Sequence, residues 1–528
     1  MRQDAITPSN GCFSVPEIIP LIAPILRRFL HIACIGVLFS ALLGPNEVQA
    51  QYFRFGKNKV HYEDQDWSYL QSEHFTVYYY DDGAYLADFT ARAAEEAFGS
   101  VARLFELDLE RRIPLIVFKN HAEFAVTNAV DLPTYSDYIG GVTELFKNRI
   151  AIPFVGDYRD FRRVIHHELV HAVVNEVYYG GSIQSLIQAG QKMRIPPWFS
   201  EGLAEYLALG WDTRSDMYMR EAVLEDQLPS IKNLNGFYAY RGGQSVWDYI
   251  AEQYGQEKIG EILQRLRSAR SVEQAIVRSI GLNLDELSER WKRTLREVHF
   301  PEVTARESLE EIAKPIITSK HGFFNTSPAL SPLGDRIAYV STTSGLFDVY
   351  IADANDGTIE KRLIQGQISR DFESLSVLTP GLSWNPEGTE LAIAVRSGRT
   401  DAVAIVDVLT ERIRLIHTDE IEQILSLSWS PDGRKIAMGA TNGIQSDIWT
   451  LDIEEEDFEN LTDDVFSDYE PAWSPDGLTI VFHSDRVDRT ELKRYSTEET
   501  RIFEENFNQL DLYLLAPNAR FARRLTTN

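Results

Sequence analysis

One short turn recurs through the C-terminal part of this 528-residue chain, and it constrains the fold more than any other feature. Each copy begins with Ser or Asn followed by Pro, reaches Gly at its fourth position and leads into an apolar strand; the copies start at Ser331, Asn385, Ser430 and Ser474. Their prolines are 54, 45 and 44 residues apart. A period of roughly 40 to 50 residues with several strands per unit is typical of β-propeller blades. The pattern therefore predicts an all-β region of about four blades over residues 315–528.

Other positions repeat together with the turn. A Trp precedes three of the copies: Trp384, Trp429 and Trp473. A later strand also recurs three times, as Asp348-Val-Tyr350, Asp447-Ile-Trp449 and Asp511-Leu-Tyr513. These repeats resemble those of the TolB-like β-propellers. The resemblance implies a surface for binding or scaffolding, because the repeats contain no catalytic group. TolB-like propellers usually have more blades, so either this propeller is open and incomplete or, as we expect, the chain is truncated at its C-terminus.

The first fifty residues read as a secretory signal. Arg27-Arg28 precedes the apolar run 29–43, Gly44-Pro45 breaks it, and Val48-Gln49-Ala50 provides small residues at a cleavage site. The run is shorter than the roughly 20 residues that a membrane span needs. We therefore expect cleavage after Ala50 and export to the periplasm or the extracellular space, with an uncleaved signal anchor as the alternative.

Charge and cysteine content narrow the functional classes. The chain has 52 Lys and Arg against 79 Asp and Glu, a net charge of −27, which argues against a nucleic-acid-binding protein and a polybasic membrane-surface protein. A hydrophobic content of 44% allows ordinary cores and excludes wholesale disorder. Because Cys12 and Cys34 both precede Ala50, the mature chain would have no disulfide, no thiolate metal site and no Cys nucleophile.

Residues 51–301 have a different pattern from the repeats. Apolar runs predict strands over 74–80, 113–118 and 149–154, and helical spacing of apolar residues predicts a helix over 85–106. Helices dominate the second half, so we expect an α+β domain here. A linker is expected over 302–314, and a piece ending near Pro301 is expected to fold without the propeller.

A metal-binding motif lies in the strongest of these helices. It reads His167-Glu168-Leu-Val-His171, and the two histidines are one turn apart on the same helical face. Two imidazoles so placed can hold one metal ion, while Glu168 can reach a water on that metal. His166 lies off that face and is interpreted as a packed or surface residue.

The sequence also bears on the third ligand. A metzincin would need Gly at position 174 and His at 177, but both are Val, which excludes that class. Downstream, Trp198-Phe-Ser-Glu201-Gly-Leu-Ala-Glu205-Tyr resembles the second zinc helix of the gluzincins. The resemblance implies Zn²⁺ bound by His167, His171 and Glu201. It also implies that Glu205 hydrogen-bonds a zinc-bound histidine.

The gluzincin resemblance extends to two more segments. Tyr240-Arg-Gly-Gly is similar to the segment that supplies a transition-state tyrosine in zinc aminopeptidases, with Tyr238 as a competitor and a structural role for both as the alternative. The segment 140–152 could form the edge strand that binds a peptide. The aminopeptidase Gly-x-Met-x-Asn motif is absent. As a whole, residues 51–300 resemble the bacterial peptidase MA-like metallohydrolases.

These features lead to two hypotheses. The first is a secreted zinc metallopeptidase in which Glu168 takes the proton of a metal-activated water, acting on a peptide or protein substrate. Its propeller would bind a substrate or an envelope protein. The second is a non-catalytic envelope-assembly scaffold. An intact Glu168 favours the enzyme, because a structural metal site needs no general base. Neither hypothesis involves nucleic acid or a membrane span in the mature chain.

Overall fold

The computed structural model describes residues 65–125, 127, 139–145, 147–179, 195–269, 271–303, 312–366, 374–375, 381–398, 400–493, 502–504 and 507–527. The predicted signal segment with its two cysteines, and most of the predicted linker, lie outside these residues. Gly56–Asn528 forms one compact unit. No helix in the described ranges is both long enough and apolar enough to cross a membrane.

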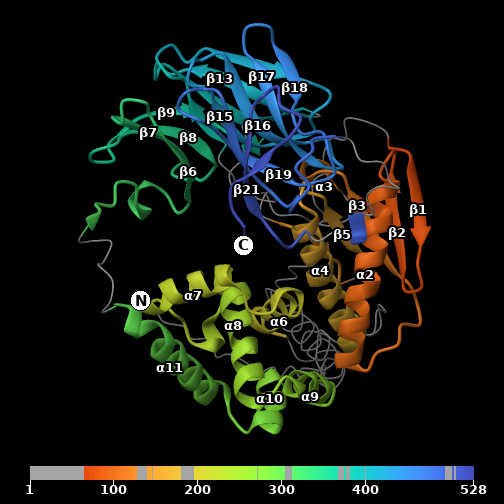
Figure 1. The fold of residues 1–528 in the computed structure, drawn as a ribbon. Helices are drawn as coiled ribbons and strands as arrows, with labels where there is room; N and C mark the ends of the chain where they lie inside the picture. The colour runs from red at the N-terminus through yellow and green to blue at the C-terminus, as the bar shows by residue number, and fades with distance from the viewer. Residues whose placement is uncertain are drawn as a thin grey trace, which may run out of the picture. The chain divides into compact units, whose positions relative to one another are not determined.

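The N-terminal region is built on a five-stranded mixed sheet of order β1-β2-β3-β5-β4 (Figure 1). Strands β2, β3 and β5 are parallel, and the two edge strands β1 and β4 are antiparallel to their neighbours. The parallel pair β2–β3 requires a crossover, which helix α2 provides. The bounds are β1 Trp67–Gln71, β2 Phe75–Tyr80, α2 Ala84–Phe105, β3 Ile113–Phe118, α3 His121–Ala125, β4 Val142–Thr143 and β5 Ile150–Pro153. The three strands and the helix predicted from the sequence are all present.

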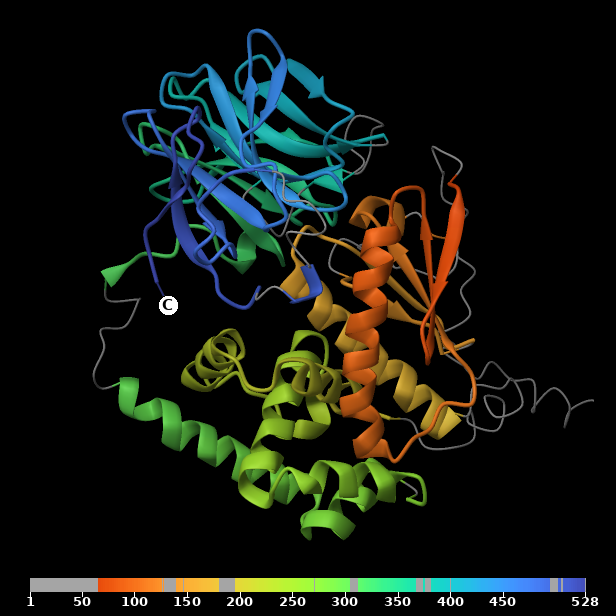
Figure 2. The ribbon, with the colours of Figure 1, turned by 45° about the vertical axis from the view of Figure 1, so that its right-hand side comes forward.

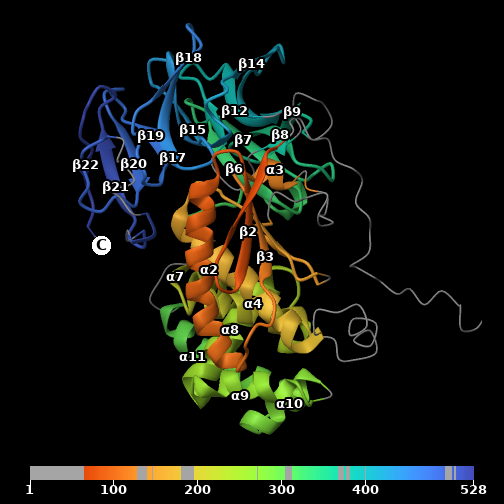
Figure 3. The same ribbon diagram turned by 90° about the vertical axis from the view of Figure 1, so that its right-hand side faces the viewer.

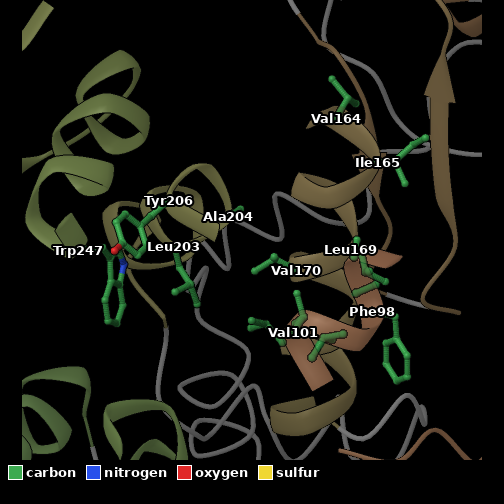
Figure 4. Packing of buried hydrophobic residues seen from close by; sticks show 14 of the residues in the cluster. Phe98, Val101, Val164, Ile165, Leu169, Val170, Leu203, Ala204, Tyr206 and Trp247 are labelled. Atoms are coloured by element: carbon green, nitrogen blue, oxygen red, sulfur yellow. The ribbon is translucent and has the colours of Figure 1, made fainter. Parts of the chain in front are cut away.

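One face of this sheet carries the main hydrophobic core. Alternate strand residues point to it, among them Val77, Leu115 and Ile152, and all three are fully buried or nearly so. Figure 2 shows α2 along this face. Helix α4, Tyr158–Tyr179, packs beside α2 in the same cluster. Figure 4 shows how side chains such as Phe98 of α2, Leu169 of α4 and Leu203 of α6 contribute to this core.

The rest of this region is helical. Helices α6 and α8 approach so closely that a Cβ on Gly202 would lie 2.3 Å from the carbonyl carbon of Gly243, so only glycine fits at the crossing. The indole N–H of Trp247 donates to the Phe199 carbonyl at 3.1 Å and fixes the same contact. The bounds are α6 Pro197–Leu209, α7 Thr213–Leu224, η2 Ile231–Asn233, α8 Phe237–Tyr254, α9 Glu257–Leu266, α10 Val272–Ile280 and α11 Leu284–Val303.

The C-terminal region consists of four antiparallel sheets that follow one another along the chain (Figure 3). They are β6-β7-β8-β9, then β10 to β14, then β15-β16-β17-β18, and finally β19-β20-β21-β22. The bounds are η3 Ser319–His321, β6 Asn325–Leu330, β7 Arg336–Ser341, β8 Asp348–Asp353, β9 Ile359–Ile364, β10 Ser374–Leu375, β11 Leu382–Trp384, β12 Glu390–Ser397, β13 Thr400–Asp407, β14 Ile413–His417, β15 Gln423–Trp429, β16 Lys435–Thr441, β17 Ser446–Asp452, β18 Asp457–Asn460, β19 Asp468–Trp473, β20 Ile480–Ser484, η4 Ile502–Glu504, β21 Asp511–Leu515 and β22 Arg523–Arg524. This is the blade pattern that the sequence predicts.

The repeated turn joins β6 to β7, β11 to β12, β15 to β16 and β19 to β20. In the third sheet the Gly433 N–H donates to the Ser430 carbonyl at 3.0 Å, and the Ser430 hydroxyl accepts from the Lys435 N–H at 2.9 Å. Gly433 has φ +76°, which favours glycine at this position. Consecutive sheets share apolar clusters that include the buried Trp384 and Trp429. Trp473, in the fourth sheet, is only half-buried.

The third and fourth sheets contact the start of α4. The Ser446 hydroxyl donates to the Gly156 carbonyl at 2.7 Å, and the Tyr158 hydroxyl donates to the Ile444 carbonyl at 2.6 Å. Phe466 and Phe507 from the C-terminal region belong to the same hydrophobic cluster as α4. These contacts join the start of α4 to the C-terminal region, and the folding of a piece that ends near Pro301 stays a prediction.

Candidate metal centre

The candidate centre is built on α4, whose sequence separates an apolar face from a face that carries ligands. Residues such as Ile165, Leu169 and Val173 are fully buried in the main core. Their helical spacing turns His167 and His171 toward α6. At the helix start, the Asp160 N–H donates to the Asp157 carboxylate at 2.9 Å. Burial of one face therefore fixes the direction of the two imidazoles on the other.

Three side chains converge on one point between α4 and α6. The Nε2 atoms of His167 and His171 are 3.2 Å apart, and the Glu201 Oε2 atom lies 3.4 Å and 3.0 Å from them, respectively. A tetrahedral metal with bonds of about 2.0–2.1 Å would place its ligand atoms about 3.4 Å apart. Two imidazole nitrogens can face each other at this distance when a proton or a metal ion lies between them, because both cannot use a lone pair toward the other. The donor set and its spacing fit a zinc ion.

A carboxylate fixes the far side of one of these imidazoles. The Oε1 atom of Glu205 lies 3.2 Å from the His167 Nδ1 atom. Arg163 and Arg241 hold the same carboxylate, at 3.3 Å from Oε1 and 3.0 Å from Oε2. Burial acts to raise the pKa of Glu205, but the His167 ring and the two guanidinium groups outweigh it and lower the pKa to about 2. Glu205 is therefore an anion that directs the other ring nitrogen of His167 toward the convergence point.

The electrostatics of the centre favour a cation. Burial alone would lower the pKa of His167, but the carboxylates of Glu201, Glu205 and Glu168 raise it to about 10. Burial would likewise raise the pKa of Glu201, but His171 and His167 lower it well below its usual range. The site thus attracts positive charge, and a bound metal ion would supply that charge in place of a proton.

Glu168 lies beside this point but does not belong to the ligand set. It is nearly buried, and its Oε2 atom accepts a hydrogen bond from the Thr143 hydroxyl at 2.7 Å. Thr143 is on β4, the edge strand of the sheet. A Cβ on Gly141, the residue before β4, would be 2.8 Å from the Glu168 Cγ, so the chain passes directly against this side chain.

The structure also distinguishes the two candidate tyrosines. The Tyr240 ring lies nearly parallel to the His167 imidazole, with centroids 6.1 Å apart and an interplanar angle of 13°. Burial first, and then the carboxylates of Glu201 and Glu168, raise the pKa of Tyr240, so its phenol stays protonated at neutral pH. Tyr238 instead has its ring against Phe237. Its pKa is raised by burial and by Glu221, which is not part of the centre.

Apart from the competing candidate Tyr238, the structure brings together the residues that the sequence suggested for the centre, listed here: His167, Glu168, His171, Glu201, Glu205 and Tyr240. His166 is mostly buried next to them, and burial lowers its pKa to about 4. Thr143, Arg163 and Arg241 were missed. Arg163 lies one turn before His167, but only the packing of α6 against α4 and α8 reveals its contact with Glu205.

Comparisons with known proteins agree with this division of the chain. Residues 93–297 match the family model of the Peptidase MA superfamily, and residues 367–511 match the model of the TolB beta propeller domain. A search of curated proteins found no match. Among solved structures, TolB from Acinetobacter baumannii is 19% identical, with a TM-score of 0.31, over 40% of this chain and 45% of that one. A putative TolB from Agrobacterium tumefaciens is 18% identical, with a TM-score of 0.29, over 37% and 62%. The chain thus spans less than two thirds of either TolB chain.

The fold and the centre define a metallopeptidase-like domain joined to propeller blades. In this chain a region that matches the Peptidase MA superfamily model is fused to repeats that match the TolB beta propeller model.

Proposed function

We propose that the protein is a zinc-dependent metallopeptidase. The observation that carries this proposal is the convergence of His167 Nε2, His171 Nε2 and Glu201 Oε2 at mutual distances of 3.0 to 3.4 Å, with Glu168 beside them. When bound there, zinc supplies a Lewis acid that makes water nucleophilic at neutral pH and polarises the scissile carbonyl.

The protein side chains then have distinct tasks. Glu168 accepts a proton from the attacking water and passes it to the leaving amine. The protonated phenol of Tyr240 donates a hydrogen bond to the oxygen that becomes negative in the transition state. Glu205 keeps His167 in the tautomer whose Nε2 is free to act as a ligand.

The exposure of the centre favours an enzyme over a structural metal site. The side chains of His171 and Glu201 are 17% and 23% exposed, and Tyr240 is 40% exposed. A structural zinc site is closed by four protein ligands, whereas a catalytic site keeps a position open. The second candidate, a non-catalytic envelope-assembly scaffold, is supported by the TolB-like repeats alone. We further propose export after cleavage near Ala50 and a protein-binding role for the propeller.

A combined metal and cleavage experiment tests the proposal. Purified mature protein is analysed for metal and incubated with a peptide library, with and without a chelator. We expect one zinc per chain, cleavage that the chelator abolishes, and loss of zinc in His167→Ala and Glu201→Ala. Unchanged zinc content in those variants would contradict the ligand assignment. A zinc-loaded protein that cleaves no peptide would favour the scaffold.

A further inference from the structure

Strand β4 contacts Glu168 through the side chain of Thr143. The Thr143 hydroxyl oxygen lies 2.7 Å from Glu168 Oε2 and 2.9 Å from the Glu168 backbone carbonyl oxygen. Gly141, two residues earlier, leaves open the space beside Oε1, because a Cβ there would come within 3.1 Å of that oxygen. Thr143 of β4 therefore contacts one carboxylate oxygen, and Gly141, just before the strand, makes room for the other.

The strand that provides these contacts is held in place. Thr143 is paired with Ile150 of β5, and the Glu144 N–H donates to the Arg149 carbonyl at 2.8 Å. The Arg149 guanidinium also binds both carboxylate oxygens of Glu144, at 2.5 Å and 2.9 Å. A β-branched Thr has few side-chain rotamers. The hydroxyl group therefore has a defined position relative to α4.

Hydrogen-bond chemistry determines which way this contact runs. An ionised carboxylate only accepts, so the Thr143 hydroxyl is the donor in this contact. Its one proton has two acceptors in reach, and Oε2 at 2.7 Å is preferred over the backbone carbonyl at 2.9 Å because the carboxylate is charged. Oε2 is then engaged, and Oε1 is the oxygen left to accept a proton from water. If the proton arrives on Oε1, Oε2 becomes the carbonyl oxygen of the acid and still accepts from Thr143. The same hydrogen bond thus fits both protonation states, and Thr143 neither gains nor loses a proton.

We propose that Thr143 is a positioning residue that holds Oε2 of Glu168, so that Oε1 is the oxygen that takes the proton of the attacking water. This inference rests on the proposed function, and Gly141 supports it by keeping the Oε1 side open. The proton passes from water to Oε1 and then to the leaving amine, while the bond between Thr143 and Glu168 persists.

Kinetics of matched variants test this role. Thr143→Val keeps the shape and removes the hydroxyl, and we expect kcat to fall about 10- to 100-fold, the usual cost of losing a hydrogen bond to a charged group. KM and zinc content should stay close to those of the wild type. Thr143→Ser retains the hydroxyl and should recover most of the activity. The control Thr76→Val makes the same change on β2, three strands away in the sheet, and should leave kcat unchanged.

Unfolding experiments test the contact without any turnover. In a double-mutant cycle with Glu168→Ala, we expect Thr143→Val to shift the urea midpoint less when it is combined with Glu168→Ala than in the wild type, because the partner carboxylate is gone. Equal shifts in the two backgrounds would overturn the inference, as would a wild-type kcat in Thr143→Val or a loss of zinc in that variant. Coupled shifts in a protein that cleaves no peptide would contradict the proposed function and still support the contact between Thr143 and Glu168.

Discussion

Two regions of the molecule each bring three potential metal ligands within 4.8 Å of one another. The first is the centre on α4 and α6, with His167, His171 and Glu201. The second lies in the propeller, with Asp447, Asp464 and Asp468, and all three of these aspartates are buried. The ligand count is the same, but the surroundings of the two groups differ.

The propeller cluster already contains its own cation. The fully buried Arg486 guanidinium binds Asp464 at 2.9 Å and also binds Asp468. Asp447 accepts hydrogen bonds from Gln445 and Asn460 on one oxygen, each at 2.9 Å. Burial raises the pKa of Asp447 to about 7, despite these two hydrogen bonds, and the charge of Asp468 adds to the increase.

At the centre on α4, the group whose pKa is raised is an imidazole, that of His167. The two arginines of this centre, Arg163 and Arg241, contact Glu205 and not the convergence point. The comparison shows that proximity of acidic and imidazole groups does not by itself define a metal site. An arginine supplies the positive charge in the propeller, whereas at the centre on α4 the imidazoles carry it as protons, or a metal ion would supply it under the proposed function.

The largest expected effect concerns the chemistry of the first region. Glu168→Gln should keep its metal and lose about 10²- to 10⁴-fold in kcat, because an amide cannot accept the proton of the water. Steady-state kinetics and metal analysis of the same preparation measure both quantities. Full activity in this variant would remove Glu168 from the mechanism.

The second prediction concerns the internal cation of the propeller. Arg486→Met would leave Asp464 and Asp468 buried without a partner, and we expect the free energy of unfolding to fall by about 3–5 kcal/mol. Urea unfolding measures this change. Arg414→Met is the matched control, because its ion pair with Glu456 is long, at 4.0 Å, and about half exposed. Similar losses in the two variants would show that Arg486 has no special role.

Adding and removing metal shows which of the two regions binds zinc. Zinc at 100 times its dissociation constant should stabilise the wild type by about 2.7 kcal/mol, and a chelator should reverse this shift in melting temperature. Glu201→Ala should abolish the effect, whereas Asp468→Asn should retain it. A zinc-dependent shift that is lost in Asp468→Asn would assign metal binding to the propeller cluster instead.

The smallest expected effect tests the link between the regions. Ser446, next to Asp447, donates to the Gly156 carbonyl near the start of α4. Tyr158→Phe and Ser446→Ala each remove one hydrogen bond of this link and should cost about 1 kcal/mol of unfolding free energy. Tyr69→Phe, on the exposed strand β1, serves as the control. If all three variants unfold alike, the link contributes nothing measurable to stability.

The sequence determined those features whose causes are local. The Ser-Pro-x-Gly turns form within a few residues. Pro restricts φ, Gly allows a positive φ, and the side chain of the first residue accepts a hydrogen bond from a backbone N–H at the end of the turn. The spacing of His167 and His171 follows from the helical period alone. For this reason the blades, the strands of the N-terminal sheet and the ligand-bearing face of α4 could all be predicted.

Only the tertiary structure decided which distant side chains meet. Thr143 reaches Glu168 because β4 pairs beside β5 at the edge of the sheet, and Tyr240 rather than Tyr238 reaches His167 because α8 crosses α6 at Gly202 and Gly243. Whether a group of acids needs an external cation likewise depended on the burial of Arg486 among them. These contacts join residues far apart in the chain, and their geometry follows from packing in three dimensions, which periodicity and spacing in the sequence do not contain.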